Sequence, residues 1–339
     1  MNFNEKNILL TGASGAVGQE VLSQLITDPS FRITVFDRQT RHSTKIFRRY
    51  KNDINIIYGD ISKKEDVEKA THNIDVVIHL AAVIPPLADH YPALAYEVNV
   101  TGTRNLLEAV KRNSPQAFFM YASSISVYGD RINSPMISTE DTLNPCEHDH
   151  YAHTKIEAEK LVTDSSLSWT IFRLSAVMGY RNHKMSGLMF EMPLDTPMEI
   201  VTPHDTGKAF VSAIHQTEEL KGQIFNLGGG DKNRLTYREF LRRSFRIYGL
   251  KKPDFPEYAF ATKNFHCGYY CDGDRLNEIL HFRNDTIKTY FSVLHEQINP
   301  AQRFFTSLFN KFIKRYFLRK SLPYLAFVKK DPVLLERFF

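Results

Sequence analysis

Two side chains near the middle of the chain have the types and spacing that proton transfer needs. Tyr151 and Lys155 stand four residues apart in a stretch with a helical pattern, so both lie on one helix face. An ammonium beside a phenol favours the phenolate, so we expect Lys155 to lower the pKa of Tyr151 from its ordinary value of about 10. Tyr151 would then exchange a proton with a substrate hydroxyl or carbonyl near neutral pH, which is the chemistry that hydride transfer requires.

Ser124 is a third candidate for the same chemistry. It follows the apolar run 117–122, which reads as a strand. A hydroxyl at the end of that strand would hold the same substrate oxygen by a hydrogen bond. Each of the three residues also has an ordinary explanation, because Tyr/Lys pairs at this spacing occur on many helices and serine at a strand end is often only a turn residue.

A glycine-rich turn near the N-terminus predicts a binding site for the molecule that would exchange the hydride. It follows the apolar run 8–10, precedes a helical pattern, and consists of Thr11, Gly12, Ala13, Ser14, Gly15, Ala16, Val17 and Gly18. Glycines three apart let the backbone turn sharply, let a pyrophosphate approach without a Cβ in the way, and let the helix pack on the sheet. Free N–H groups at the helix end attract the anion, so we expect a dinucleotide phosphate here.

An acidic residue follows at the distance that a dinucleotide site needs. The apolar run 32–36 ends in Asp37, about twenty residues after the glycines, where a carboxylate accepts hydrogen bonds from an adenosine ribose. Asp37 favours NAD. Arg38 and Arg41 would receive a 2′-phosphate, so NADP stays open.

Further runs alternate strand, loop and helix, as an open α/β sheet does. Strands are expected at 54–58, 74–80, 117–122 and 170–174. Ligands bind at the C-terminal ends of such strands, so we expect a cofactor to contact Asp60, Ile61, Leu80, Ala81 and Ala82. Asp60 either accepts from an adenine amino group or caps the helix that starts near Ser62, and both readings stay open.

Composition and cysteine content indicate an ordinary intracellular protein. The 339 residues with 42% apolar composition allow a large core. The sparse, odd set of cysteines argues for a reducing compartment, so we expect a cytoplasmic location. His266, Cys267 and Cys271 lie close together, yet no second ligand pair stands at zinc-site spacing, and no metal is expected. Residues 8–10 are too short an apolar run for a signal peptide, and no stretch approaches the length of a membrane span.

The positive charge of the chain is concentrated at its C-terminal end. Residues 301–339 hold nine Lys or Arg against Asp331 and Glu336, although the net charge of the whole chain is only +5. The rest of the chain has no excess of basic residues of the kind that binds nucleic acid. The same segment has an apolar stripe at four-residue spacing with cations beside it, formed by Phe304, Leu308, Phe312 and Tyr316, by Phe305, Phe309, Ile313 and Phe317, and by Lys311, Lys314, Arg315 and Arg319.

This stripe predicts one basic amphipathic helix with two possible uses. Such a helix can lie on an anionic membrane, which would suit an apolar or lipid-linked substrate. Alternatively, it packs on the rest of the protein or across a subunit interface, as most amphipathic helices do.

The chain resembles the extended short-chain dehydrogenase/reductase family, which contains sugar-nucleotide epimerases and dehydratases, up to about residue 230. The resemblance rests on the order and spacing of TGASGAVG, Asp37, Gly59-Asp60, HLAA, Asn99, YASSISVYG and YAHTK. It implies a doubly wound parallel α/β (Rossmann) sheet with a smaller C-terminal substrate lobe. It also implies a proton-transferring Tyr151, a Lys155 that binds the nicotinamide ribose and tunes the tyrosine, and a substrate-orienting Ser124. In this family Asn99 would support the cofactor region, and the helices of Asn99 and Tyr151 would form the interface of a homodimer.

The resemblance divides the chain into three parts. A cofactor domain would cover 1–174 with a return segment at 204–230, a substrate lobe 175–203 and 231–300, and a basic aromatic segment 301–339. Two departures from the family argue against a nucleotide sugar: Ala176 replaces the asparagine three residues after Arg173, and 199–201 lacks an arginine. Dehydration is disfavoured because no Asp-Glu pair follows Ser124.

Two enzyme classes fit these features. One is an NAD(P)-dependent epimerase that oxidises and re-reduces a carbon of a sugar or sugar-nucleotide-like substrate. The alternative is a dehydrogenase or reductase of an apolar hydroxy or keto substrate that is steroid-, polyketide- or lipid-like. A third reading is a member that binds cofactor without turnover, against which the presence of Ser124, Tyr151 and Lys155 argues.

Overall fold

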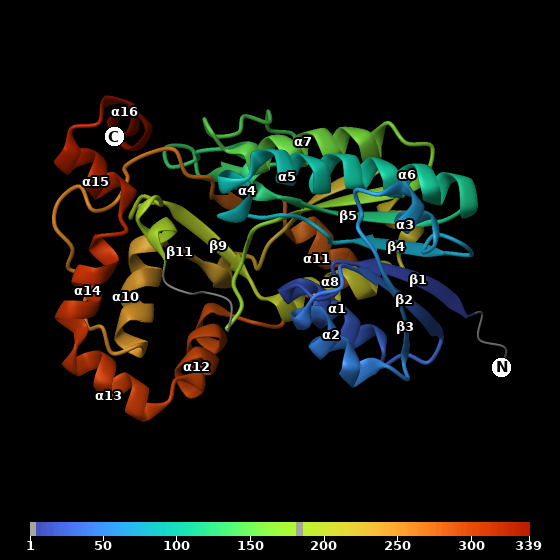
Figure 1. Ribbon diagram of the computed structural model, residues 1–339, viewed down its shortest axis with the longest axis horizontal. Coiled ribbons are helices and arrows are strands. Elements are labelled where there is room, and N and C mark those ends of the chain that lie inside the picture. The colour runs from blue at the N-terminus through green and yellow to red at the C-terminus, as the bar shows by residue number, and fades with distance from the viewer. Residues whose placement is uncertain (1–4, 181–185) are drawn as a thin grey trace.

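Seven parallel strands form the central sheet of the computed structural model (Figure 1). The structure describes residues 5–180 and 186–339; 1–4 and 181–185, which belong to the predicted units 1–174 and 175–203, lie outside the described residues. The strand order is β10-β7-β5-β4-β1-β2-β3, and the strands are β1 (Lys6–Thr11), β2 (Phe31–Asp37), β3 (Ile54–Tyr58), β4 (Val76–His79), β5 (Phe118–Ser124), β7 (Ser168–Leu174) and β10 (Gln223–Leu227). The order reverses between β1 and β4, as in a doubly wound sheet, and this confirms the predicted fold class.

Helices cover both faces of this sheet. One face carries α1 (Ala16–Leu25), α2 (Arg41–Phe47), α8 (Pro203–Ala213), α9 (Thr217–Leu220) and α11 (Asp274–Leu280). The other carries α3 (Lys64–Glu68), α6 (Gly102–Asn113) and α7 (His150–Thr163), with α4 (Leu87–His90) and α5 (Pro92–Tyr96) beside α7 (Figure 1). Ile8 and Leu10 of β1 enter the first core and Leu9 the second. A strand buried on both faces needs an unbroken apolar run, and so the strands are readable in the sequence.

A smaller lobe follows the sheet and packs around its own apolar core. It contains a three-stranded sheet with the order β11-β9-β8, and the bounds are β8 (Ala176–Val177), β9 (Pro197–Val201) and β11 (Arg234–Thr236). Helices α10 (Tyr237–Ile247) and α12 (Ile287–Gln297) pack on it. A short pairing of β6 (Met136–Ile137) with β12 (Tyr269–Tyr270) ties the lobe to the long loop before α7.

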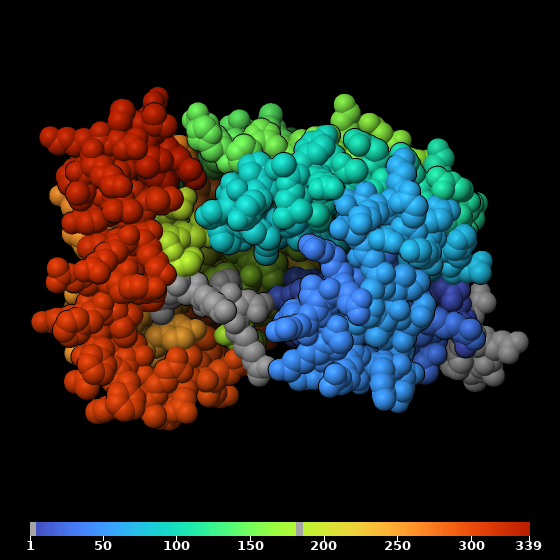
Figure 2. Space-filling model, in the orientation of Figure 1, coloured from blue at the N-terminus to red at the C-terminus, as the bar shows by residue number. Residues whose placement is uncertain are grey.

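The predicted single C-terminal helix is wrong, because the segment folds as several short helices. These are α13 (Pro300–Leu308), α14 (Asn310–Leu318), α15 (Leu322–Lys329) and α16 (Pro332–Phe338), which form one end of the molecule (Figures 1 and 2). The break at Phe309 has a local cause. The buried Asn310 side chain donates to the carbonyl of Ser307 at 2.5 Å and so competes with the backbone for that acceptor.

The apolar stripe is therefore divided between the lobe and the surface. Ile313, Phe317 and Leu318 pack against the core of the lobe. Large parts of Phe304, Phe305, Leu308, Phe309, Phe312 and Tyr316 stay exposed, up to 75% for Phe312. Among the described residues, no helix has both the length and the apolar character needed to cross a bilayer.

Candidate active site

Three glycines shape the turn between β1 and α1, each in a different way. Gly12 has a φ of +72°, and a Cβ there would lie 2.6 Å from the amide nitrogen of Ala81. A Cβ on Gly18 would lie 2.2 Å from the carbonyl oxygen of Gly12, so this glycine lets α1 pack against the turn. A Cβ on Gly15 would meet only the Gly12 oxygen, at 3.3 Å. Gly15 is thus the position that is open to a ligand.

A cavity of about 230 Å³ lies over this turn at the C-terminal ends of β1 to β4. Its walls are Gly12, Ser14, Gly15, Phe36, Asp37, Arg38, Gly59, Asp60, Ile61, Leu80, Ala81, Ala82, Val83 and Val98. The other predicted turn residues stand behind it: Ala13 is in the core, and Ala16, Val17 and Gly18 belong to the first turn of α1. The structure thus brings the predicted turn, ribose and adenine positions to one cavity.

The carboxylates of Asp37 and Asp60 are fixed by backbone amides at this cavity. Asp37 accepts from the amide of Ser14 and from that of Arg38, both at 2.8 Å. Asp60 accepts from the amide and the hydroxyl of Ser62, at 3.1 and 2.9 Å. Helix α3 starts only at Lys64 with no side-chain cap, so Asp60 stabilises a turn rather than a helix.

The residues present fit a dinucleotide cofactor. A ligand phosphate can approach the backbone at Gly15, the N-cap of α1, where free amides and the helix dipole attract an anion. Asp37 stands at the end of the neighbouring strand, where a ribose would place its hydroxyls.

Asn99 links the cofactor cavity to the helix of the predicted catalytic residues. A π-helical turn, Glu97–Thr101, stands between α5 and α6, and Asn99 lies inside it. Its amide oxygen accepts from the backbone of Val83 at 2.7 Å, and its nitrogen donates to the Val83 carbonyl and to Thr154, both at 2.9 Å. One buried amide therefore joins the wall at Val83 to α7 between Tyr151 and Lys155.

Lys155 does not lower the pKa of Tyr151 in this structure, contrary to the prediction. Its ammonium donates to the carbonyl of Ala122 at 2.7 Å and to the hydroxyl of Tyr121 at 3.2 Å, and lies 5.7 Å from the centre of the Tyr151 ring. Burial lowers the pKa of Lys155 itself to about 7, against the opposing effect of Glu159. Burial raises the pKa of Tyr151 well above its ordinary value, and only a hydrogen bond with Ser124 acts in the other direction.

Buried polar side chains such as His79 lie near Lys155, and nothing in the sequence marks them apart from the motifs in which they stand. His79 hydrogen-bonds to Thr11 at 2.7 Å and to Thr103 at 2.9 Å through its two ring nitrogens. Burial and the charge of Lys155 lower the pKa of His79 to about 3, so the ring stays neutral. His79 therefore serves the structure, by joining Thr11 to Thr103.

Tyr151 also lines a second cavity of about 330 Å³ between the sheet and the lobe. The charged groups on its walls come from widely separated segments, and sequence reasoning missed most of them: Asp89, Glu147, His148, Asp149, Glu191, His266 and Arg337. Arg337, in the last helix of the chain, pairs with Glu191 at 3.1 Å. No local pattern in the sequence indicates that such distant residues meet, and we name this space the Tyr151 cavity.

An apolar cavity of about 220 Å³ adjoins the Tyr151 cavity inside the lobe. Leu188 and Phe265 line both. The remaining lining is almost entirely aromatic, aliphatic and methionine, including Met189, Met192, Phe240, Leu241 and Tyr290. Part of it comes from the insertion after Val177 that the sequence assigned to the substrate lobe.

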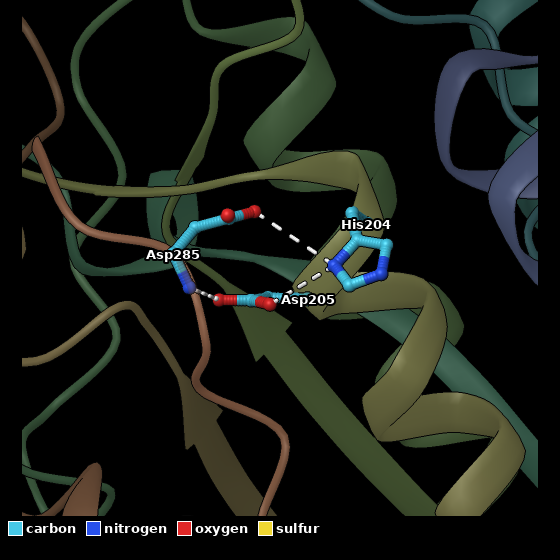
Figure 3. A group of neighbouring side chains, drawn as sticks. All are labelled: His204, Asp205 and Asp285. Carbon is cyan, nitrogen blue, oxygen red and sulfur yellow. Dashed lines mark hydrogen bonds and ion pairs between the residues drawn. The ribbon is translucent and has the colours of Figure 1, made fainter. Parts of the chain in front are cut away.

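One group of side chains has the spacing of a metal site but is already occupied by protein contacts. His204, Asp205 and Asp285 place ligand atoms within 4.8 Å of one another, as no other group among the described residues does (Figure 3). Asp205 accepts from the amides of Asn284 and Asp285, both at 2.9 Å, and Asp285 accepts from Thr202 at 2.6 Å. These hydrogen bonds hold the start of α8 against residues 284 and 285, which explains why the three side chains lie close together. His266, Cys267 and Cys271 are separate, since His266 bonds to Asp149 and Cys271 to the carbonyl of Ile137.

A family model described as "NAD dependent epimerase/dehydratase family" matches residues 8–196, more than half of the chain. The chain belongs to this family. The match confirms the resemblance found in the sequence, and it covers the glycine turn, Asn99 and the Tyr151–Lys155 pair.

Curated members of the family are similar over part of their length. An N-acetyl-alpha-D-glucosaminyl-diphospho-ditrans,octacis-undecaprenol 4-epimerase of Escherichia coli O157:H7 is 34% identical over 186 residues, 52% of this chain and 50% of that protein. A 3-beta-hydroxysteroid dehydrogenase of Mycolicibacterium neoaurum is 26% identical over 61% of this chain and 57% of that protein. The chain thus spans half to three fifths of these relatives.

Solved structures of the family share the fold. A UDP-glucuronic acid 4-epimerase from Bacillus cereus, in complex with UDP-glucuronic acid and NAD, superposes with a TM-score of 0.70 at 21% identity, covering 86% of this chain and 100% of that one. At this identity the likeness shows the fold alone.

Proposed function

We propose that the protein is an NAD-dependent oxidoreductase or epimerase that exchanges hydride with a secondary alcohol or ketone carbon. One observation carries the proposal: Asn99 binds Val83 of the cofactor cavity and Thr154 of the helix that places Tyr151 in the second cavity. One short segment of the chain lines both cavities, because Ala82 and Val83 line the first and Pro85 lines the second.

The residues of this chain would divide the work as follows. The backbone at Gly15 and the carboxylate of Asp37 hold the cofactor, which when bound supplies the hydride acceptor and donor. Tyr151 takes the proton of the substrate hydroxyl during oxidation and returns it during reduction. Ser124 hydrogen-bonds to the same oxygen and holds it toward Tyr151.

Lys155 needs a different hydrogen-bond acceptor to take part in the reaction at Tyr151. Its ammonium donates to the Ala122 carbonyl and the Tyr121 hydroxyl, so it does not stabilise a Tyr151 phenolate. Lys155 would help to hold the nicotinamide ribose of the cofactor, whose hydroxyls would offer its ammonium another acceptor. Cofactor binding is therefore expected to precede activation of Tyr151.

The Tyr151 cavity favours a hydroxyl-rich substrate head, as in a sugar or sugar-nucleotide-like molecule. Asp89, Asp149 and Glu191 supply carboxylates, which accept hydrogen bonds from hydroxyls, and Arg337 supplies donors. The family asparagine is replaced by Ala176, and Arg173 is tied to Glu159 at 2.7 Å in a buried ion pair. These two positions therefore offer no diphosphate-binding groups.

A second candidate function is oxidation or reduction of an apolar hydroxy or keto substrate. The observation that favours it is the apolar cavity, which shares Leu188 and Phe265 with the Tyr151 cavity. A substrate with both a hydroxylated head and an apolar part would use both spaces. The 3-beta-hydroxysteroid dehydrogenase among the relatives agrees with this alternative.

The function is tested by finding the cofactor and the substrate class. Small molecules released from the denatured protein are identified by mass spectrometry, and NAD+, NADH, NADP+ and NADPH are titrated. Resident NAD(H) indicates an epimerase, and free exchange indicates net oxidation or reduction. UDP-glucuronic acid, UDP-N-acetylglucosamine and a 3β-hydroxysteroid are then assayed both for NADH formation and for conversion to an epimer. A protein that binds none of the four cofactors would disprove the proposal.

We further propose a cytoplasmic homodimer, with the dimer formed through the helices that carry Asn99 and Tyr151. Tyr96 at the end of α5 is 44% exposed and donates to Glu157 of α7 at 2.6 Å, so the outer surface of these helices is part apolar and part polar. Such a mixed surface is typical of subunit interfaces. Light scattering during size-exclusion chromatography measures the mass.

The same proposal includes peripheral contact of 301–339 with an anionic membrane surface. Six large apolar side chains of α13 and α14 are exposed, and Lys311, Arg315, Arg319 and Lys320 are exposed beside them without an ion pair among the described residues. Apolar side chains enter the interface of a bilayer while cations bind its anionic headgroups. The segment occupies one edge of the molecule, as Figure 2 shows, so a flat surface can reach it.

A further inference from the structure

A histidine and an aspartate form a hydrogen-bonded pair on the wall of the Tyr151 cavity. Nδ1 of His266 lies 2.8 Å from Oδ2 of Asp149. The other carboxylate oxygen of Asp149 accepts from the amide of Ala152 at 2.9 Å and so caps α7, two residues before Tyr151. Asp149 is therefore held at both oxygens, and it holds the ring of His266.

The hydrogen bond to Asp149 determines which ring nitrogen of His266 carries the proton. Burial opposes the charge of Asp149, but the hydrogen bond and charge of His266 and the Ala152 amide outweigh it, so the pKa of Asp149 lies below its ordinary value. An ionised Asp149 accepts only, so Nδ1 of His266 carries a proton. In the neutral ring Nε2 is then an acceptor.

Nε2 of His266 is available to the cavity. No other side chain or backbone group among the described residues hydrogen-bonds to this ring. The side chain is 22% exposed, so it also reaches solvent. A partly exposed base that shares a cavity with Tyr151 has the placement that a proton relay needs.

The buried titratable residues Lys155 and His79 are not proton acceptors of this kind. Lys155 donates inward to Ala122 and Tyr121. His79 uses both ring nitrogens for Thr11 and Thr103, and its low pKa keeps it from taking up a proton. After each net oxidation Tyr151 holds the proton of the substrate, so a base must remove that proton before the next oxidation, and burial, which raises the pKa of Tyr151, opposes its release.

We propose that His266, held by Asp149, is a second acid–base residue through which the proton of Tyr151 exchanges with solvent. In the oxidative direction the O–H bond of Tyr151 breaks, its electron pair stays on the phenol oxygen, and a new N–H bond forms at Nε2, directly or over one water. The imidazolium then releases that proton to solvent and becomes neutral again. Reduction uses the same steps in reverse.

Other charged and titratable groups surround the pair, and any pH profile must be read with them. They lie in the loop before α7, in α4, in the first turn of α7, in the lobe and in α16, and are Asp89, Asp130, Glu147, His148, His150, Tyr151, Glu191 and Arg337. The inference rests on the proposed function in one respect, namely that Tyr151 takes the substrate proton.

Chemical rescue tests the role directly, using the full-length protein with NAD+ and whichever panel substrate it oxidises. His266→Ala should form NADH about a hundredfold more slowly than wild type, the usual size of a lost acid–base group. Added imidazole should restore the rate, and the rescued rate should rise with pH as the added imidazole becomes neutral. His148→Ala is the matched control, because it removes another histidine of the same cavity that makes no bond to Asp149.

A second variant separates proton transfer from structure. His266→Asn can keep the bond to Asp149 but has no titrating nitrogen, so it should bind NAD and unfold like wild type yet stay slow, with or without imidazole. Full activity of His266→Ala, or a slow variant that imidazole never rescues, would overturn the inference and leave the proposed function intact. A wild-type protein that binds NAD but oxidises no panel substrate would remove the premise as well.

Discussion

The ammonium of Lys155 lies 2.7 Å from the carbonyl oxygen of Ala122 and 5.7 Å from the centre of the ring of Tyr151, the phenol that it is expected to serve. Burial makes the charged form of Lys155 costly to the fold, since the desolvated ammonium loses more hydration than its two hydrogen-bond partners replace. The site is therefore arranged for a bound ligand rather than for its own stability.

Lys155→Met should stabilise the ligand-free protein at neutral pH. The folded pKa of Lys155 is lowered to about 7 from 10.5, so between these values the unfolded chain binds more protons. Stability of wild type then rises with pH over that window, whereas the variant lacks this dependence. The gain should be a few kcal/mol at pH 7 or below and should vanish near pH 10, because one pKa unit corresponds to about 1.4 kcal/mol.

Denaturant unfolding of both proteins at several pH values measures this difference. Lys160→Met, which removes an exposed lysine from the same helix, is the control and should show no such trend. A gap between Lys155→Met and wild type that is the same at every pH would contradict the assigned cause.

Gly15→Ala and Gly18→Ala should separate ligand approach from packing. The Gly15 methyl meets only the Gly12 oxygen at 3.3 Å, so that variant should fold normally and bind NAD at least about tenfold more weakly. The Gly18 methyl would lie 2.2 Å from the same oxygen, so that variant should also lose about 1–3 kcal/mol of stability. Calorimetric titration and thermal unfolding test both, and unchanged NAD affinity in Gly15→Ala would place the phosphate elsewhere.

Asn99→Ala should reduce both stability and turnover. It leaves the amide and carbonyl of Val83 and the hydroxyl of Thr154 without their partner, which costs about 1–3 kcal/mol. Asn113→Ala removes another amide of the same helical run, bonded to Glu68 and Thr71 away from the cavities. Equal loss of kcat in the two variants, at matched folded fractions, would show that Asn99 has no special link to catalysis.

The wild-type protein should sediment with vesicles that contain phosphatidylglycerol and much less with pure phosphatidylcholine, and added salt should weaken the binding. Replacing Phe304 and Phe312 by serine should lower binding at least about tenfold, as should Lys311→Glu with Arg315→Glu. Leu87→Ser with Tyr91→Ser is the control, since both residues are exposed but lie in a different part of the molecule. Sedimentation without vesicles would indicate self-association, and equal loss in the control pair would contradict the assigned surface.

The central sheet could be predicted because each strand is an apolar run buried on both faces. Residues 54–58 form β3 with the bounds that the sequence predicted. The strands of the lobe could not, since β8, β11 and β12 are two or three residues long and carry no periodic pattern.

The site was only partly readable for a similar reason. The glycine turn, Asp37 and Tyr151 lie in local motifs, whereas the Tyr151 cavity depends on contacts such as Arg337 with Glu191, which no spacing reveals. The pKa of Tyr151 was predicted in the wrong direction because spacing places Lys155 on the correct face but does not show that its ammonium bonds to Ala122. The roles assigned to Ser124, Tyr151 and Lys155 stay predictions.

The central claim is that Tyr151 moves the substrate proton while NAD takes the hydride. Its most direct test is single-turnover NADH formation by wild type and Tyr151→Phe, each saturated with NAD+ and mixed with the substrate found in the panel. We expect the variant to bind NAD+ normally and to form NADH at least about a hundredfold more slowly. An undiminished rate in Tyr151→Phe would contradict the account.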